Sequence, residues 1–182
     1  LDVLVFALAP DNLEEVLQTL RQIGRLSGHD EAALQTETTL RSRVNAVRKA
    51  VENIPESARP LVLWGQLKAP MYTAGKGSFI DDIIRIAGGI NIAADLGRGW
   101  PQIGLEILVT KNPQAIITSD GRDKIKKDLT QLRTKSGWKT VDAIANGQVY
   151  SLDRNLLSRP GPRLIAGLEA VAQILHPNLF LR

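Results

Sequence analysis

Short runs of apolar residues, typical of buried strands, alternate along most of this chain with segments in which apolar residues recur every three or four positions. The short runs predict strands at residues 3–8, 61–64, 115–118 and 148–152. The periodic segments predict helices at residues 78–87, 105–111, 122–133 and 162–175. Because strands separated by helices usually form a parallel sheet with helices on both faces, we expect an α/β, Rossmann-like lobe with a mostly parallel sheet.

Before this lobe, two helical patterns follow each other with no strand between them. Residues 11–14 have the spacing of a capping box that begins the first helix, and Gly24 and Gly28 are expected to end it. The second pattern begins at Asp30 and continues without Pro or Gly to about Val51, which predicts a helix roughly 33 Å long. A helix of this length suits a stiff connection between two lobes better than a layer of one α/β domain.

Composition and charge change this picture little. The chain is 43% hydrophobic and 23% charged, which is ordinary for a globular protein, and no apolar run approaches the roughly 18 residues of a membrane span. The net charge of +4 is dispersed, and its one lysine cluster, at residues 124–127, lies beside Asp123 and Asp128. We interpret that cluster as a solvated helix face. No basic and aromatic strip is present, so nucleic-acid binding is not expected.

The sequence offers little support for catalysis or for a cofactor. It contains no cysteine, which excludes thiolate ligands and cysteine nucleophiles. Residues 75–78 (Gly-Lys-Gly-Ser) lack the spacing of a phosphate loop and are better explained as a turn with a helix cap. His29 and His176 have no metal-ligand spacing, and the adjacent carboxylates of residues 81–82 would point in different directions on a helix. We expect no enzyme, metal or cofactor site, although a site that uses only carboxylates stays open.

The most informative stretch is residues 100–106, Trp-Pro-Gln-Ile-Gly-Leu-Glu. Trp100 precedes a proline and is pushed toward an extended conformation, so its ring is expected on a loop, where an indole often contacts a ligand. Glu106 lies in the first turn of a short helix, where a negative charge suits the helix dipole. The alternative is that Trp100 packs beneath its own loop and that Glu106 only compensates the dipole.

Several motifs in a consistent order carry a family resemblance. They are residues 73–78, 88–93 (Gly-Gly-Ile-Asn-Ile-Ala), 100–106, 138–150 (Trp-Lys-Thr-Val-Asp-Ala-Ile-Ala-Asn-Gly-Gln-Val-Tyr), 159–163 (Arg-Pro-Gly-Pro-Arg) and 176–177 (His-Pro). With these motifs the chain resembles the C-terminal lobe of the cobalamin- and iron-chelate-binding (class III) periplasmic substrate-binding proteins of bacterial ABC importers. The resemblance implies a bilobal protein on the extracytoplasmic side, periplasmic or lipid-anchored, that delivers its ligand to a membrane permease.

The resemblance also implies a division of the chain. Residues 1–28 would be a remnant of the N-terminal lobe, residues 29–58 the inter-lobe helix and linker, and residues 59–182 the C-terminal ligand-binding lobe. Most of the N-terminal lobe is therefore expected to be missing. The unpaired strand at residues 3–8 would then have open edges, from which we expect self-association, in the form of a homodimer that exchanges this segment.

The same resemblance implies roles for particular residues. Trp100 would be an aromatic platform for the ligand, and Glu106 would dock against arginines of the permease. Further residues expected to line the cleft are Arg159, Asn155, Tyr72, Gln66 and Lys76. The Trp-Pro-Gln run favours cobalamin or a related corrinoid, and a ferric siderophore or haem is the alternative. A different class, an α/β enzyme or cofactor-processing protein with the same bilobal fold, also stays open.

Overall fold

The computed structural model describes residues 5–157 and 159–180. Within these residues a sheet of four parallel strands lies at the centre, in the order β3-β1-β5-β6. Its strands are β1 (Leu61–Trp64), β3 (Ile90–Asn91), β5 (Ala115–Thr118) and β6 (Val149–Ser151). Val62 is paired with both Asn91 and Ala115, and Ile117 with Tyr150. The predicted parallel sheet is therefore confirmed.

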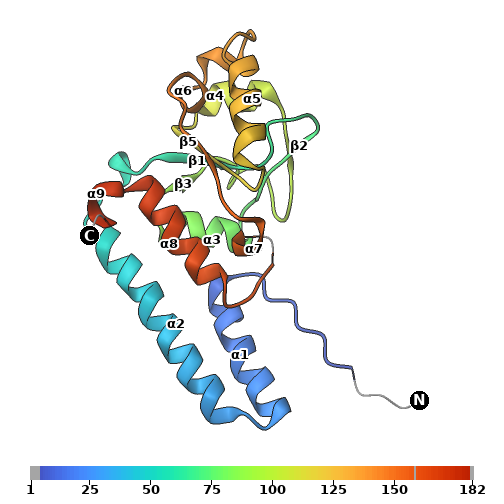
Figure 1. Cartoon of the computed structure of the whole chain (residues 1–182), viewed down its shortest axis with the longest axis vertical. Helices are drawn as coiled ribbons and strands as arrows, with labels where there is room; N and C mark the ends of the chain where they lie inside the picture. Colours follow the sequence, from blue (N-terminus) through green and yellow to red (C-terminus); the bar gives the residue numbers. More distant parts are fainter. Residues whose placement is uncertain (1–4, 158, 181–182) are drawn as a thin grey trace.

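The sheet is covered on both faces, as predicted. Alternate residues of the strands enter different cores: Val62 and Trp64 join one hydrophobic cluster, whereas Leu63 joins the other. In Figure 1, α3 (Phe79–Ile86) and α8 (Leu164–Leu175) lie below the strands, and α4 (Leu105–Lys111), α5 (Arg122–Leu132) and α6 (Asp142–Ala145) lie above them. The chain thus forms a three-layer α/β lobe.

Helices α1 (Leu13–Ser27) and α2 (Asp30–Val51) form an antiparallel hairpin that extends below the sheet (Figure 1). The long helix has the predicted bounds, and its 22 residues are uninterrupted. Both helices contribute buried apolar residues to one hydrophobic cluster. These residues are Leu13, Val16, Leu17, Leu40, Val44 and Val47. Arg43 of α2 donates two hydrogen bonds to Glu169 of α8, at 2.8 and 2.6 Å, and so ties the hairpin to the lobe.

Both ends of α1 differ from the prediction. The N-cap is Asn12 rather than Asp11, because the Asn12 side chain accepts a hydrogen bond from the backbone N–H of Glu15 at 2.9 Å. Gly24 lies inside the helix, and a Cβ there would approach the Cβ of Ala33 to 2.3 Å. Gly24 is therefore explained by close packing of α1 against α2, and only Gly28, with φ of 70°, ends the helix.

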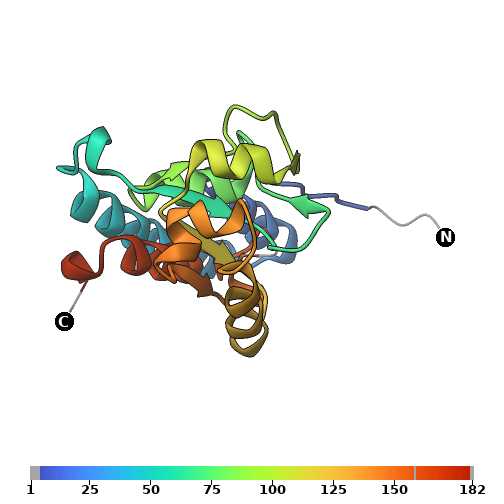
Figure 2. The same ribbon diagram turned by 90° about the horizontal axis from the view of Figure 1, so that it is seen from above.

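The prediction of a strand at residues 3–8 is wrong for residues 5–8, which the structure describes. Residues 5–10 form no regular element, and the side chains of Val5 and Phe6 are 80% and 61% exposed. Val3 and Leu4 lie outside the described residues. An apolar run becomes a strand only where a neighbouring strand completes its ladder, and no described strand pairs with this segment, which extends away from the lobe (Figure 2). The predicted self-association through it stays a prediction.

Several short elements were not predicted, because two to four residues show no measurable periodicity. β2 (Met71–Tyr72) and β4 (Gln102–Ile103) form an antiparallel ribbon, and α7 (Arg154–Leu157) follows β6. The other short elements that were not predicted are β3, α6, the 3₁₀ turns η1 (Glu56–Ala58) and η2 (Trp138–Thr140) and the terminal helix α9 (Pro177–Phe180). The helix predicted from Pro162 begins two residues later, at Leu164.

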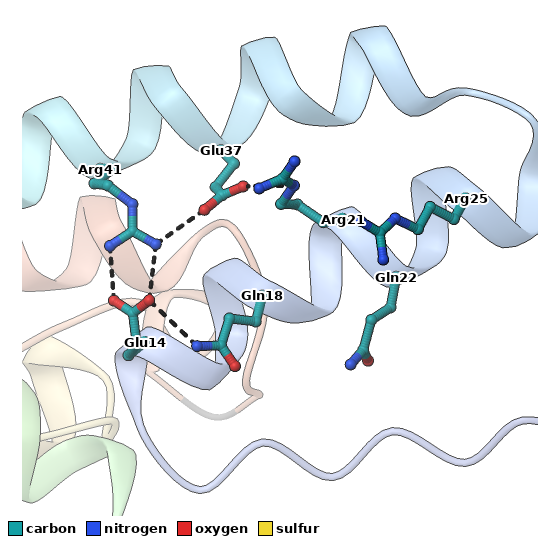
Figure 3. Close-up of a pocket in the computed structure, with 7 residues that line it drawn as sticks. All are labelled: Glu14, Gln18, Arg21, Gln22, Arg25, Glu37 and Arg41. Atoms are coloured by element: carbon teal, nitrogen blue, oxygen red, sulfur yellow. Dashed lines mark hydrogen bonds and ion pairs between the residues drawn. The ribbon is translucent and has the colours of Figure 1, made fainter.

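Charged side chains hold α1 against α2 at a hollow of about 340 Å³ (Figure 3). Arg41 donates two hydrogen bonds of 2.8 Å to Glu14 and one of 2.9 Å to Glu37. Glu37 is only 7% exposed, and its second oxygen lies 3.3 Å from Nε of Arg21. Because these charges are paired with one another across the two helices, we interpret the hollow as a structural contact rather than a binding site.

Replacing Glu14 with Gln should make the unfolding free energy less dependent on pH in the acid range. The guanidinium of Arg41 holds the pKa of the Glu14 carboxyl below its ordinary value of 4.5. A carboxyl with a lowered pKa in the folded state stabilises the fold above its unfolded pKa, and this contribution is lost as the pH falls through the folded pKa. Below pH 4.5 the unfolding free energy of the wild type should therefore decrease more than that of Glu14→Gln. The difference should stay under about 1 kcal/mol because the pair is half-exposed.

Urea denaturation over a pH series measures this difference. The matched control is Glu31→Gln, which removes an exposed acid from the first turn of α2. Equal acid sensitivity of the wild type and Glu14→Gln would contradict the stabilising role of the pair.

Candidate functional site

Three of the predicted ligand-binding residues follow the carboxyl ends of the sheet strands. Gln66 comes shortly after β1, Asn155 lies in α7 just after β6, and Arg159 lies in the loop that leads toward α8. All three side chains are exposed. The carboxyl ends of parallel strands meet at one edge of the sheet, which is the usual place for ligands of this fold class.

A pair of loops at the end of the β2–β4 ribbon carries the other candidates. Tyr72 of β2 is paired with Gln102 of β4. Beyond this pair, the backbone N–H groups of residues 73, 75 and 76 donate to the carbonyl oxygens of residues 101, 99 and 97, at 3.0, 2.8 and 2.9 Å. The segments 73–77 and 97–101 therefore lie side by side, although 19 residues separate them in the sequence.

Gly75 is required where these two loops approach most closely. A Cβ at this position would come within 2.3 Å of the carbonyl oxygen of Gly97 and within 2.9 Å of Cδ of Pro101. Both neighbours are constrained, one as backbone and the other as a proline ring, so neither can move aside cheaply. The glycine thus allows the ladder that positions Trp100.

Trp100 stands on its loop as predicted, and its ring is braced from one side. It meets the ring of Phe79, the first residue of α3, edge to face, with centroids 6.1 Å apart and an interplanar angle of 70°. An aromatic pair of this geometry is worth about 0.5–1.5 kcal/mol beyond the area it buries. Trp100 nevertheless remains 52% exposed, so much of the indole is available to another molecule.

The exposed indole borders a hollow of about 320 Å³. The hollow is lined by Pro10, Asp11, Lys76, Gly77, Ser78, Phe79, Arg98, Gly99 and Trp100. The structure thus brings two of the predicted residues together, Trp100 and Lys76. Tyr72 lies on the same ribbon without lining this hollow, and Gln66, Asn155 and Arg159 do not line it.

Two residues of the hollow, Phe79 and Arg98, were missed in the sequence. Arg98 had a recognisable signal, since a charged residue between Gly97 and Gly99, two positions before Trp100, indicates a loop that presents this side chain to solvent. Phe79 had no such signal, because its place as the first apolar residue of α3 is also that of an ordinary core residue.

Residues 75–78 form the turn and helix cap that the sequence predicts. Oγ of Ser78 accepts a hydrogen bond from the backbone N–H of Asp81 at 3.2 Å. The Asp81 carboxylate accepts from the backbone N–H of Gly77 at 3.0 Å and from the side chain of Asn91 at 2.9 Å. These contacts hold the turn beneath Lys76 in one conformation.

Glu106 lies in the first turn of α4 and does not line the hollow beside Trp100. Its side chain is exposed, and within the described parts of the chain it forms no ion pair. A carboxylate on a short helix with no partner of its own is available for a contact with another protein, and it equally suits the helix dipole.

Both histidines contact backbone carbonyl oxygens. Nδ1 of His29 lies 2.7 Å from the carbonyl oxygen of Ser27, and Nε2 of His176 lies 3.2 Å from that of Gly88. Among the residues that the structure describes, no three His, Cys, Asp or Glu side chains are grouped so that they could hold a metal ion. No helix in this part of the chain is long and apolar enough to cross a membrane.

The chain belongs to the periplasmic binding protein family, whose model matches residues 1–156. An uncharacterised ABC transporter substrate-binding lipoprotein of Bacillus subtilis is 31% identical over 170 residues, which are 93% of this chain and 52% of the relative. A cobalamin-binding protein of Halobacterium salinarum is 32% identical over 171 residues, 92% of this chain and 46% of the relative. The chain therefore spans about half the length of these curated relatives.

Solved structures share the fold at lower sequence identity. The periplasmic vitamin B12 binding protein of Vibrio cholerae superposes with a TM-score of 0.77 at 22% identity, over 97% of this chain and 66% of that one. A periplasmic haem-binding protein of Roseiflexus superposes with a TM-score of 0.76 at 21% identity, over 92% of this chain and 64% of that one. The family is one of periplasmic solute-binding proteins rather than enzymes, and the Bacillus subtilis relative is a substrate-binding lipoprotein. These findings confirm the prediction that the chain is not an enzyme and the prediction of an extracytoplasmic location.

Gly75→Ala should separate the loops that carry Lys76 and Trp100. The added methyl would overlap backbone, and overpacking of this kind costs about 1–3 kcal/mol. We expect a lower unfolding free energy together with a red shift of the Trp100 fluorescence. The Trp100 signal is obtained as the difference between the spectrum of each protein and that of the same protein with Trp100→Phe added. Gly121→Ala is the control, because a Cβ there meets nothing within 4 Å. An unchanged Trp100 signal in Gly75→Ala would contradict the proposed role of the close approach.

Proposed function

We propose that this chain supplies the ligand-contacting C-terminal lobe of the substrate-binding component of an ABC importer, and that the ligand is cobalamin or a related corrinoid. The observation that carries the proposal is the half-exposed Trp100 ring, braced by Phe79 over a hollow. An indole face suits a large, flat macrocycle, since it offers apolar area with little loss of conformational entropy on binding. The cobalamin-binding relative supports the choice of ligand.

The arrangement of the chain fits a two-lobed protein. In this proposal residues 59–182 form the ligand-binding lobe, residues 29–58 the inter-lobe helix and linker, and residues 1–28 a part of the other lobe. In a protein of the relatives' length, further residues would face the edge where Gln66, Asn155 and Arg159 lie, and together with Tyr72 these side chains would complete the cleft.

A ferric siderophore or haem is the second candidate ligand. It is favoured by the haem-binding structure with the same fold, and an exposed indole suits a porphyrin as well as a corrin. The two candidates differ in charge and in the metal that they carry, so direct titration distinguishes them.

Trp100→Ala should weaken ligand binding at least about 10-fold, which corresponds to about 1.4 kcal/mol. The reason is that the substitution removes both the apolar platform and its contact with Phe79. The complete gene product that contains this chain is titrated by calorimetry with cyanocobalamin, haem and a ferric hydroxamate. Leu179→Ala, which removes a similarly exposed apolar side chain from α9, is the control and should leave affinity unchanged. Equal affinity of the wild type and Trp100→Ala would exclude the platform.

Glu106→Ala should leave ligand affinity intact and abolish binding to the permease. A carboxylate on a short helix can accept a bidentate contact from an arginine, which fixes the orientation of docking as well as adding attraction. Binding of the loaded protein to detergent-solubilised permease and uptake by cells measure the effect. Asp123→Ala, at an exposed acid in the first turn of α5, is the control. Normal uptake with Glu106→Ala would exclude the docking role, and Glu106 would then only compensate the helix dipole.

A further inference from the structure

Two cations enter the Trp100 hollow from the two paired loops. Lys76 and Arg98 form an isolated parallel β-bridge, in which the N–H of Lys76 donates to the carbonyl oxygen of Gly97 at 2.9 Å. Both side chains line the hollow beside the indole. Their backbones are therefore fixed relative to each other and to the ring, even though the side chains themselves are exposed.

Neither cation is neutralised within the described residues. Lys76 and Arg98 form no ion pair there, whereas Arg41, Arg43 and Lys111 each have a carboxylate partner. A lysine and an arginine that share a hollow without partners repel each other, and an anionic group between them would remove that repulsion.

The nearby carboxylates are mostly engaged elsewhere. Asp81 accepts hydrogen bonds from Gly77 and Asn91, and Asp82 accepts from the backbone N–H of Leu13 and pairs with Arg85. Among the described residues that line the hollow, Asp11 is the single acid. The hollow thus has two cations against one anion.

Arg98 and Gly77 line the same hollow as Trp100. A Cβ at Gly77 would lie 3.8 Å from one of the terminal nitrogens of Arg98, so the guanidinium lies over the Gly77 turn with no side chain between them. The planar fork of a guanidinium matches the two oxygens of a phosphate or carboxylate, and a lysine adds a mobile point charge.

We propose that Lys76 and Arg98 form a subsite for one anionic group of the ligand, placed at the edge of the ring that Trp100 supports. This inference rests on the proposed function. A phosphodiester, such as the one in the nucleotide loop of cobalamin, and a carboxylate, such as a haem propionate, have the chemistry that the subsite selects. Arg98 then contributes to specificity, while Trp100 supplies general affinity for a macrocycle.

The test compares ligands with and without the anionic group. The complete gene product and its Lys76→Gln/Arg98→Gln variant are titrated with cyanocobalamin, with dicyanocobinamide, which lacks the phosphodiester, and with haem. Loss of the charge-assisted hydrogen bonds should weaken binding of the ligand whose anionic group the subsite holds, cyanocobalamin or haem, about 10- to 100-fold. Binding of cobinamide should not weaken. A loss confined to cobalamin identifies the phosphodiester, and a loss confined to haem identifies the carboxylate.

Two further variants sharpen the result. Asp11→Asn removes the opposing charge from the hollow and should tighten binding of the anionic ligand. Lys126→Gln removes an exposed lysine from α5, outside the hollow, and should change nothing. Binding of the anionic ligand by the wild type should also weaken as salt is raised, and this dependence should be smaller in the double variant.

The outcomes separate the two levels of the proposal. If cobalamin, cobinamide and haem are all affected equally by the double substitution, or not at all, the anionic subsite is overturned while the proposed function stands. If the wild type binds neither a corrinoid nor an iron chelate, the proposed function is overturned and the subsite with it. Circular dichroism and urea denaturation establish that each variant is folded.

Discussion

The pairing of β1 with a parallel neighbour on each side is the constraint on which the rest of the structure depends. Because β1 is internal, its side chains must alternate between two cores, and helices must cover both faces of the sheet to keep those cores from water. Parallel pairing also brings the carboxyl ends of all the strands to one edge. The loops that carry Gln66, Asn155 and Arg159 are collected there for this reason.

The α1–α2 hairpin follows a different logic. Its two helices pack through one stripe of apolar side chains. Ion pairs add contacts at two places. Arg41 pairs with Glu14 and Glu37 within the hairpin, and Arg43 pairs with Glu169 of the lobe. Exposed pairs contribute little stability, but bidentate ones fix orientation. The hairpin is therefore held at a defined angle to the sheet, as a rigid connection between two lobes would require.

At the candidate site, backbone contacts hold the loops in place, and the exposed side chains would supply the affinity for a ligand. The ladder between residues 73–77 and 97–101, made possible by Gly75, positions one aromatic ring and two cations around a single hollow. An aromatic surface selects for size and flatness, whereas unpaired cations select for charge.

The pattern of apolar residues alone predicted the elements that are long enough to bury several apolar side chains, such as α2 and the strands β1 and β5. The alternation of strands and helices also predicted the parallel sheet. The motifs around Trp100 indicated the family. Only the tertiary structure decided that residues 5–10 form no strand, since a strand needs a neighbour, and that Gly24 packs inside a helix. It also decided that Lys76, Arg98 and Phe79 meet at Trp100. These contacts join segments distant in sequence through a two-residue ribbon too short to leave any periodic signal, so the neighbours of each side chain appear only once the chain has folded.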